Sequence, residues 1–235
     1  MNLTRFERQL RIIGEELQRR IRHYKVAIFG IGGLGSYVSY LLTCLGVGEL
    51  VLVDFDRVSI PDLNRQILYD YQSVGIYKTI IAYRKLSKFV NDTSICCINT
   101  KIFEDSGLIH EIVKKVDIIF DCLDNIDSRL VINDLCLRYR KPMIHGGVSE
   151  LRGQVIFLPG DGPCLRCILR TSRVRRVEVL AFTCSLTASL QVREFLEYVK
   201  GRKEPRAIFV DLEKPTLRTF RIDRLKECES CKYLT

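Results

Sequence analysis

The sequence lacks the features of a membrane-spanning, secreted or disordered chain. Its longest apolar passage, Tyr37 to Val53, is interrupted by Gly46, Gly48 and Glu49, which predicts a helix, a turn and a strand instead of a membrane span. Residues 1–26 alternate charged and apolar side chains and contain neither the apolar core nor the cleavage site of a signal peptide. Repeats and low-complexity tracts are also absent. We therefore expect a soluble, cytoplasmic protein with no membrane partner.

Histidine is scarce, and acidic residues are outnumbered. The three histidines, His23, His110 and His145, follow no common pattern, so we expect them to be structural. The 37 Lys and Arg residues exceed the 28 Asp and Glu residues, which gives a net charge of +9. Such an excess suggests an acidic partner, either a protein surface or a polyanion, while a basic solvated surface is the more common explanation.

The pattern of apolar segments predicts a Rossmann-like α/β fold. Buried strands and helical stretches alternate as far as residue 146, which indicates a mostly parallel sheet with helices on both faces. From Gly147 onward, apolar strands follow one another and predict antiparallel strands beside that sheet, with a helix at Ser185 to Val199. The predicted strands are 24–29, 50–53, 94–98, 116–120, 142–145, 153–159 and further strands within 206–222.

The length of the chain favours one domain. With 235 residues, an α/β chain can bury one well-packed core. We therefore predict a single domain over residues 1–235. Its parts would be N-terminal helices (1–25), a nucleotide-binding half (26–146) and a second half (147–235) that contains the antiparallel strands and two cysteine pairs.

A glycine-rich turn follows the first predicted strand. Gly30, Gly32 and Gly35 have the G-x-G-x-x-G spacing, and Asp54 lies 19 residues beyond Gly35 at the end of the next strand. Glycines at such a turn let backbone N–H groups approach phosphate oxygens, and the aspartate can accept hydrogen bonds from ribose hydroxyls. The pattern alone predicts a nucleotide, and it fits an NAD-dependent oxidoreductase as well as an ATP-using enzyme.

Charged residues further along the chain favour ATP. Arg65 and Lys78 follow the second strand, where both could fold back over the phosphates. Fixed cations stabilise a triphosphate whose charge moves during reaction, whereas the loop and helix already serve the two phosphates of a dinucleotide. Asp121 and Asp124 end a predicted parallel strand, where open α/β sheets bind ligands and a carboxylate can hold Mg²⁺. Because a helix cap explains Asp121 equally well, we favour Asp124 as the Mg²⁺ ligand.

The ten cysteines include two Cys-x-x-Cys pairs. Cys164 and Cys167 form the first pair, and 60 residues separate them from the second, Cys228 and Cys231. Four thiolates in two such pairs are typical of a structural, tetrahedral Zn²⁺ site, whereas a redox dithiol usually involves one pair at a helix start. Other cysteines fall in apolar segments and are expected in the core, namely Cys44, Cys96, Cys97, Cys122 and Cys136.

Together, these motifs resemble the ThiF/MoeB/HesA family, whose members are adenylating enzymes related to ubiquitin activation. The resemblance follows the family's order of motifs and covers nearly the whole chain. Besides the two cysteine pairs, the matching segments are RFERQ (5–9), GIGGLGS (30–36), VDFDRVSIPDLNRQ (53–66), VGIYK (74–78), DCLDN (121–125) and GQVIF (153–157).

The resemblance implies a reaction and a set of partners. The enzyme would use ATP to adenylate the C-terminal glycine carboxylate of a ubiquitin-like sulfur carrier protein ending in Gly-Gly, with release of pyrophosphate. Such carriers serve molybdopterin synthesis, thiamine synthesis or tRNA thiolation. A homodimer and a sulfurtransferase partner are also implied. Two alternatives stay open: activation of a carboxyl group on a modified tRNA base, and a non-catalytic scaffold of the same fold.

The resemblance also assigns residues to this reaction. Arg65 and Lys78 would contact the β and γ phosphates, Asp124 would hold Mg²⁺, and Arg8 would reach the triphosphate from the partner subunit. The wider nucleotide-binding set comprises Gly32, Gly33, Gly35, Asp54, Asp62, Asn64, Arg65, Lys78, Asp124 and Asn125.

The chain departs from the family in two places. Where the family commonly has Asn in an N-L-x-R-Q motif, this chain has Asp62, whose charge would weaken ATP binding or add a magnesium contact, and Asn64 would compensate in part. Members that form a thioester or persulfide use a cysteine after the first cysteine pair, where this chain offers only Cys184 at the start of a buried helix. We expect adenylation without a covalent enzyme intermediate, because free cysteines are usually buried.

Arginines gather beside the first cysteine pair. They could guide an acidic carrier, bind tRNA phosphates or form a solvated loop. No aromatic residue lies among them, which does not favour a nucleic-acid partner. The set is Arg166, Arg170, Arg173, Arg175 and Arg176.

Overall fold

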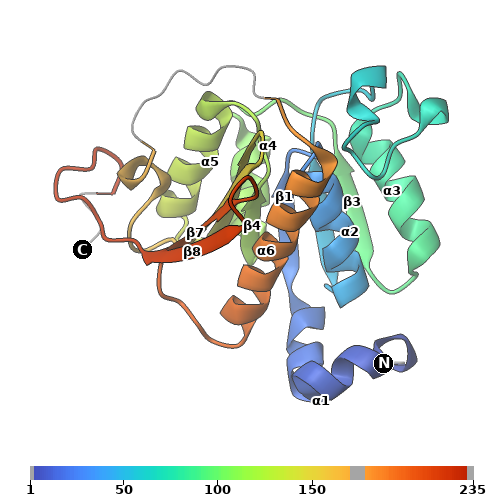
Figure 1. Ribbon diagram of the computed structural model, residues 1–235, viewed down its shortest axis with the longest axis horizontal. Coiled ribbons are helices and arrows are strands. Elements are labelled where there is room, and N and C mark those ends of the chain that lie inside the picture. The colour runs from blue at the N-terminus through green and yellow to red at the C-terminus, as the bar shows by residue number, and fades with distance from the viewer. Residues whose placement is uncertain (1–2, 170–177, 232–235) are drawn as a thin grey trace.

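The computed structural model describes residues 3–169 and 178–231. Its eight-stranded sheet has the order β3-β2-β1-β4-β5-β6-β7-β8 (Figure 1). Neighbouring strands from β3 to β5 are parallel, and β6, β7 and β8 continue the sheet as antiparallel strands. The strands are β1 (Lys25–Phe29), β2 (Glu49–Val53), β3 (Ser94–Ile98), β4 (Ile118–Asp121), β5 (Met143–Ser149), β6 (Arg152–Leu158), β7 (Arg206–Asp211) and β8 (Thr216–Arg221).

Helices cover both faces of the sheet, which confirms the predicted fold class. Apolar side chains of α2, α3 and α6 form one core layer with the sheet, and those of α4 and α5 form the other. None of the helices within residues 3–169 and 178–231 is long and apolar enough to cross a bilayer. The helices are α1 (Glu7–His23), α2 (Gly35–Leu45), α3 (Lys78–Phe89), α4 (Gly107–Lys115), α5 (Ile126–Arg138) and α6 (Ala181–Val199), with 3-10 turns η1 (Thr4–Phe6), η2 (Ile60–Asp62), η3 (Tyr71–Ser73) and η4 (Leu165–Cys167).

The central strands are buried because they are apolar on both faces. All of β4 is buried, and so is β1 after Lys25, as expected for parallel strands between two helical layers. By contrast, every residue of β8 is exposed, since β8 forms the edge beyond the helices. The sheet therefore changes from a covered parallel centre to an open antiparallel edge.

The other edge strand corrects one prediction about cysteines. Cys122 and Cys136 are buried as expected, but Cys96 is exposed. It lies on β3, which ends the sheet on the side opposite β8 and has a neighbour only in β2. An apolar sequence pattern does not distinguish a central strand from an edge strand, so the core assignment of Cys96 was wrong.

Helix α6 starts earlier than the sequence pattern predicts. We expected it at Ser185, and it begins at Ala181. Thr183 and Cys184 already lie on its buried face, which continues through Thr187 and Ala188 at helical spacing. The extra turn brings the start of the helix to the glycine loop, where it becomes part of the site described next.

Helix α1 bends at Gly14, whose φ of +78° is outside the helical region. The part before the bend extends away from the sheet at the N-terminal end in Figure 1. Phe6 anchors this part of the helix to the end of α2. Its ring is buried and packs closely against Gly46, where an added Cβ would lie 2.5 Å from Phe6 Cζ. Arg8 is on this projecting part and is exposed.

Candidate nucleotide and acceptor site

The turn between β1 and α2 is a tight glycine loop. Gly30 has a φ of +87°, and a Cβ there would lie 2.7 Å from the carbonyl oxygen of Cys122. A Cβ on Gly35 would lie 1.8 Å from the carbonyl oxygen of Gly30. Gly32 and Gly33 line a pocket, as Gly30 also does. The loop therefore needs two glycines for its own geometry and presents the backbone of the other two to a ligand.

The loop lies at the point where the order of the strands reverses. β1 has β2 on one side and β4 on the other, so the connections from β1 and β4 leave in opposite directions. Open α/β sheets bind ligands in the crevice outside the carboxyl ends of such strands. The carboxyl ends of β1, β2 and β4 supply Gly30, Asp54 and Asp121, which explains why these distant residues meet.

Asp54 is held by the loop itself. Its Oδ2 accepts a hydrogen bond from Ile31 N at 2.7 Å, and its Oδ1 accepts one from Asp56 N at 2.8 Å. Burial raises the pKa of Asp54, while the positive charge of Lys78 and the two N–H donors act in the opposite direction. Each carboxylate oxygen retains a lone pair, so a ligand hydroxyl can still be bound.

Lys78 begins α3 and points its ammonium into the same pocket. Its side chain is only 7% exposed, and Nζ lies 3.0 Å from Oδ2 of Asp56. Both residues line the pocket. An ammonium has three donors, so Lys78 can keep this ion pair and still donate to phosphate oxygens.

Asp62 has a structural role. Its Oδ2 accepts hydrogen bonds from Ser59 N at 2.9 Å and Ser59 Oγ at 2.8 Å, and its Oδ1 accepts one from Gln66 Nε2 at 2.7 Å. Arg65 Nη2 lies 3.6 Å from Oδ1. The bond from Ser59 N is part of the capping box of η2. With the other contacts, it means that the Asp62 carboxylate already has partners within the protein.

Two side chains beside Asp62 differ in where they point. Gln66 is 3% exposed and lines the pocket, and its Oε1 has no partner among the described residues. Asn64 is exposed, does not line the pocket and accepts a hydrogen bond from Arg65 Nη1 at 3.0 Å. Gln66 is therefore better placed than Asn64 to accept a hydrogen bond from a ligand.

The turn after β4 carries Asp124 and Asn125 at the pocket wall, both exposed. Asn125 Oδ1 accepts a hydrogen bond from Ser128 N at 2.9 Å and so caps α5. The cap considered for Asp121 is therefore supplied by Asn125. Asp121 is fully buried, and its Oδ1 accepts a hydrogen bond from Leu123 N at 3.0 Å. The free carboxylate on this turn belongs to Asp124.

Asp121, His145 and Arg129 form a buried charged cluster next to this turn. His145 Nδ1 lies 2.6 Å from Oδ2 of Asp121, and Arg129 Nη1 lies within 3.0 Å of both His145 ring nitrogens. Arg129 also donates to the carbonyl oxygens of Leu123 and Gly146. It thereby ties the turn that carries Asp124 to the end of β5.

The pKa values of Asp121 and His145, the two titratable partners of Arg129, are both lowered. Burial alone would raise the pKa of Asp121, but the Arg129 guanidinium, His145 and the Leu123 N–H outweigh it, so this pKa is lowered. Burial and the charge of Arg129 lower the pKa of His145, and Asp121 opposes them only in part. The cluster consequently holds an ionised Asp121 and a neutral His145. No histidine lines the pocket formed by the described residues, consistent with a structural role.

The pocket is larger than a single small-molecule site. It has a volume of about 1740 Å³, whereas ligand pockets usually measure about 300–1,000 Å³. It continues from the glycine loop over β5, β6, β7 and β8. Of the predicted nucleotide residues, those that line it are Gly32, Gly33, Asp54, Asp62, Arg65, Lys78, Asp124 and Asn125, and those that do not are Arg8, Gly35 and Asn64.

Cys184 lies against the glycine loop, near the start of α6. Its Sγ would be 3.0 Å from a Cβ on Gly33, and the residue lines the pocket. Burial raises the pKa of the Cys184 thiol, although Arg65 acts against this. A buried, protonated thiol is a poor nucleophile, which fits the expectation that adenylation proceeds without an enzyme thioester.

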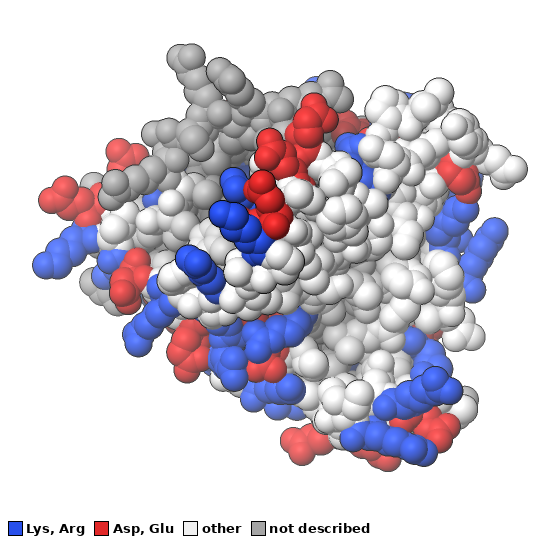
Figure 2. Space-filling model, viewed as in Figure 1, with Lys and Arg blue, Asp and Glu red and all other residues white. Residues whose placement is uncertain are grey.

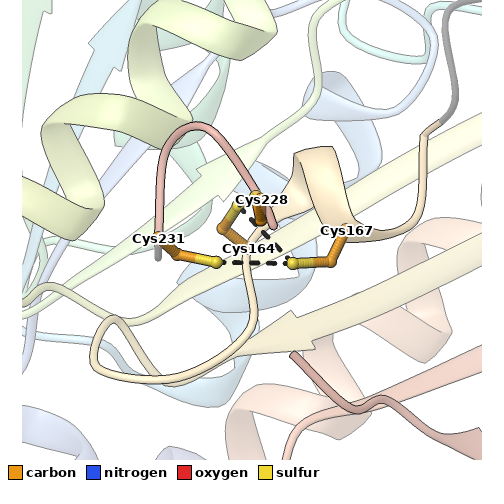
Figure 3. A group of neighbouring side chains, drawn as sticks. All are labelled: Cys164, Cys167, Cys228 and Cys231. Atoms are coloured by element: carbon orange, nitrogen blue, oxygen red, sulfur yellow. Dashed lines mark hydrogen bonds between the residues drawn. The ribbon is translucent and has the colours of Figure 1, made fainter. Parts of the chain in front are cut away.

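The two cysteine pairs meet in one cluster, where Figure 3 shows the four side chains pointing toward one another. The Sγ–Sγ distance is 3.5 Å between Cys164 and Cys228, 3.4 Å between Cys167 and Cys231, and 4.0 Å between Cys164 and Cys167. All four Sγ atoms lie within 4.8 Å of one another. Ligands about 2.3 Å from a tetrahedral metal would lie roughly 3.8 Å apart. The donor set and its geometry therefore fit a tetrahedral metal ion.

Hydrogen bonds join this cluster to α5. Asn133 Oδ1 accepts a hydrogen bond from Leu165 N at 2.7 Å, and Arg166 forms an ion pair of 3.0 Å with Asp134. Arg166 also lines the pocket. The other arginines of the basic segment lie outside the described residues, namely Arg170, Arg173, Arg175 and Arg176.

Sequence reasoning missed several pocket residues. Gln66 and Asp56 stand within the matched segment 53–66, so the motif contained a signal that we did not use. Gln154 likewise stands within the matched segment 153–157, whereas Arg129 had no such signal. Both line the pocket because α5 and β6 pass beside β5, and that proximity exists only in the folded chain.

Comparisons with known proteins identify the family of the chain. The model of the ThiF family matches residues 6–232. "Adenylyltransferase and sulfurtransferase MOCS3" of Drosophila ananassae is 34% identical over 170 residues, which are 71% of this chain and 37% of that protein. "Sulfur carrier protein adenylyltransferase" of Thermus thermophilus is 28% identical and is matched over 97% of this chain and 90% of its own length. The chain thus spans a little over a third of the MOCS3 relative.

Among solved structures, the fold is shared with MccB of E. coli. The structure described as MccB with ATP superposes with a TM-score of 0.84 at 23% identity, over 97% of this chain and 74% of that one. At this identity, the likeness supports the arrangement of sheet and helices. Because the family match covers nearly the whole chain, the chain belongs to the ThiF family.

Proposed function

We propose that this protein is an adenylyltransferase that uses ATP and Mg²⁺ to activate the C-terminal glycine carboxylate of a ubiquitin-like sulfur carrier protein. A carboxylate oxygen of the carrier would attack the α phosphorus of ATP. The bond from that phosphorus to the bridging oxygen would break, giving an acyl adenylate and pyrophosphate. The observation that carries the proposal is the continuous pocket from the glycine loop to β8, which has room for a nucleotide and an extended peptide.

The inner end of the pocket suits a triphosphate. Gly32 and Gly33 present backbone donors, and Arg65 and Lys78 add positive charge. The exposed carboxylate of Asp124 would hold Mg²⁺, which neutralises phosphate charge when bound. Attack on phosphorus needs positioning and charge neutralisation but no protein nucleophile, which agrees with a pocket without histidine among the described residues. The charges of Arg65, Lys78 and Asp124 have no comparable purpose in an NAD-dependent oxidoreductase.

The outer part of the pocket suits the tail of a carrier. Gly147, Gln154 and Phe209 form one row across β5, β6 and β7 and line the pocket. A row of this kind leaves a shallow floor on which an extended peptide can lie. The carrier's terminal carboxylate would lie beside Gly147, where it would face the phosphates.

The cysteine cluster would hold structural Zn²⁺. With four protein ligands, the ion would keep no open coordination position and would act on stability. Its role would be to fasten the segment after β8 to α5. We also propose that residues 1–235 form one adenylation domain.

A homodimer would complete the site. Arg8 is exposed, does not line its own chain's pocket and has no side-chain partner among the described residues, so it is free to reach the site of a second copy. Figure 2 shows few charged side chains over α2 and the N-terminal half of α6. Phe182 and Leu186 on α6 are 55% and 37% exposed, as expected for an apolar contact surface. A sulfurtransferase that serves the acyl adenylate would be a further partner.

Pyrophosphate exchange into ATP tests the proposed reaction. Purified protein, Mg²⁺ and candidate small proteins ending in Gly-Gly are expected to give exchange that depends on the carrier. An arm without carrier and an arm with the carrier's terminal glycine removed serve as controls. Absence of exchange with every carrier would contradict the proposal and favour a scaffold.

Mixing two inactive variants tests the dimer. Arg8→Ala and Asp124→Ala would each inactivate a homodimer, but a mixed dimer would contain one site with both residues intact. Mixing equal amounts is expected to restore about a quarter of the normal activity, because half of the dimers are mixed and each has one working site. No recovery from subunits that exchange would contradict a shared site.

A further inference from the structure

The floor of the pocket ends at an unpaired cation on the edge strand. The row of Gly147, Gln154 and Phe209 continues to Arg218 on β8, because Phe209 and Arg218 are partners in the β7–β8 register. All four residues line the pocket. Residues paired across strands point to the same face of a sheet, so the Arg218 side chain lies on the face that forms the floor.

Arg218 has the charge and freedom needed to bind a partner. It is exposed, and its guanidinium has no partner among the described residues. Arg152, on the same face, is by contrast paired with Asp211 at 3.3 Å and Glu213 at 3.4 Å. Unpaired positive charge at this end of the floor thus comes from Arg218, with Lys214 nearby in the turn before β8.

Acidic residues on another wall of the pocket are less suited to bind the tail of a carrier. Glu227 and Glu229 follow β8 and line the pocket, and neither forms an ion pair among the described residues. Neither glutamate is part of a strand, whereas Arg218 is fixed in the floor row.

The spacing of the floor sets which tail residue would meet Arg218. Three strand-to-strand steps separate Gly147 from Arg218, and at about 4.8 Å each they cover roughly 14 Å. An extended peptide advances about 3.3 Å per residue. A chain whose terminal carboxylate lies beside Gly147 therefore passes Arg218 about four residues earlier. Between them it crosses Phe209, whose ring lies 5.9 Å from that of Phe220.

We propose that Arg218 is a specificity-determining residue that binds an acidic side chain about four residues before the C-terminal glycine of the substrate tail. The proposal rests on the proposed function, because it requires the tail to occupy this floor. Phe209 and Phe220 form an apolar surface for the residue between that acidic side chain and the terminal glycines. A basic residue in the acidic position is repelled.

Labelled peptides ending in Gly-Gly test this assignment directly. A series carries one Glu at the third, fourth, fifth or sixth position before the terminal glycine, with matched peptides that carry Gln or Lys. Binding to the full-length protein with AMP and Mg²⁺ is measured by fluorescence anisotropy. Glu near the fourth position is expected to bind about threefold to tenfold more tightly than Lys, as for an exposed ion pair.

Two substitutions on β8 separate the charge of Arg218 from a general effect. Arg218→Glu is expected to reverse the preference between Glu and Lys. Arg221→Glu is the matched control, because Arg221 is exposed on the same strand and its partner in the register, Arg206, places it on the opposite face. A preference that survives Arg218→Glu, equal binding of Glu and Lys peptides, or no binding of any peptide would overturn the proposal.

Pyrophosphate exchange with the same peptides distinguishes this proposal from the proposed function. Exchange without a charge preference would leave adenylation standing and remove the role of Arg218. A charge preference in binding without exchange by any peptide or carrier would support Arg218 as a reader of the tail and contradict adenylation.

Discussion

The two ends of the pocket differ in how their side chains are held. At the inner end, Asp54 and Asp62 have their carboxylates bonded to backbone or neighbouring side chains, and Lys78 is nearly buried. At the outer end, Arg218 and Phe220 stand exposed on an edge strand. Groups fixed in this way can stabilise charge without reorganising during reaction, whereas exposed groups on an edge are free to be replaced.

This difference separates chemistry from recognition. The inner end lies at the reversal of strand order in a covered parallel sheet, where a change of residue disturbs the packing on both faces. The outer end lies on an antiparallel extension with one open edge. The proposed adenylation would therefore depend on the first region, and the proposed choice of carrier would depend on the second.

The largest effect is expected from Asp124→Ala, which tests whether the inner end performs the chemistry. Loss of the exposed carboxylate should lower carrier-dependent pyrophosphate exchange about 100- to 1,000-fold, because it removes the proposed Mg²⁺ ligand. Asp127→Ala is the control, since Asp127 is exposed on the same segment but does not line the pocket. Equal losses in both variants, with unchanged melting curves, would contradict the assignment.

Metal removal tests whether the cysteine cluster stabilises the second half of the chain. A chelator, or Cys228→Ser, should lower the melting temperature by about 5–10 °C, which corresponds to roughly 2–3 kcal/mol for a chain of this size. Cys96→Ser should leave it unchanged, because Cys96 is exposed on β3 and outside the cluster. Released zinc can be counted with a colorimetric chelator. A melting temperature insensitive to chelator would argue against a structural metal.

A smaller effect is expected from pH, through the buried cluster beneath Asp124. The folded protein lowers the pKa of His145 through burial and Arg129, so the unfolded state binds the proton first. The stability present above the unfolded pKa of about 6.5 is lost as pH falls toward the folded value, by at most about 1.4 kcal/mol per pH unit. Urea unfolding between pH 7.5 and 5.5 should show this slope.

The control variants make the pH effect specific. His145→Gln should flatten the slope, and His110→Gln serves as the control, because His110 bonds to Tyr139 and to the Glu104 carbonyl oxygen, away from the cluster of Asp121, Arg129 and His145. An unchanged slope in His145→Gln would assign the pH dependence to other groups.

The smallest effect is expected from Asp62→Asn, which restores the residue common in the family. The affinity for ATP should change by less than about twofold, because the Asp62 carboxylate already bonds to Ser59 and Gln66. Stability should fall by less than about 1 kcal/mol. The unpaired Oε1 of Gln66 can accept a hydrogen bond from the new amide after a flip of the Gln66 side chain. A tenfold gain in affinity, measured with a fluorescent ATP analogue, would show that Asp62 opposes the phosphates.

The sequence predicted most of the inner end and little of the outer end. The turn glycines, Asp54 and Lys78 belong to local segments whose spacing is set by one strand, one turn and one helix, so pattern reading found them. The floor row of Gly147, Gln154, Phe209 and Arg218 joins four strands, and only the register brings it together. Likewise, Cys96 is exposed because β3 is an edge strand, which the sequence did not show. Asn125 caps α5 because of the way the turn after β4 closes.

The position of the cysteine pairs along the chain has a consequence for biosynthesis. The ribosome makes Cys164 and Cys167 first, and 60 further residues, which include α6, β7 and β8, must follow before Cys228 appears. At about 5–20 residues per second, the first pair waits roughly 3–12 s for its partner. A metal bound by all four sulfurs would therefore bind only after β7 and β8 have been made, and its binding would mark the completion of that half of the nascent protein.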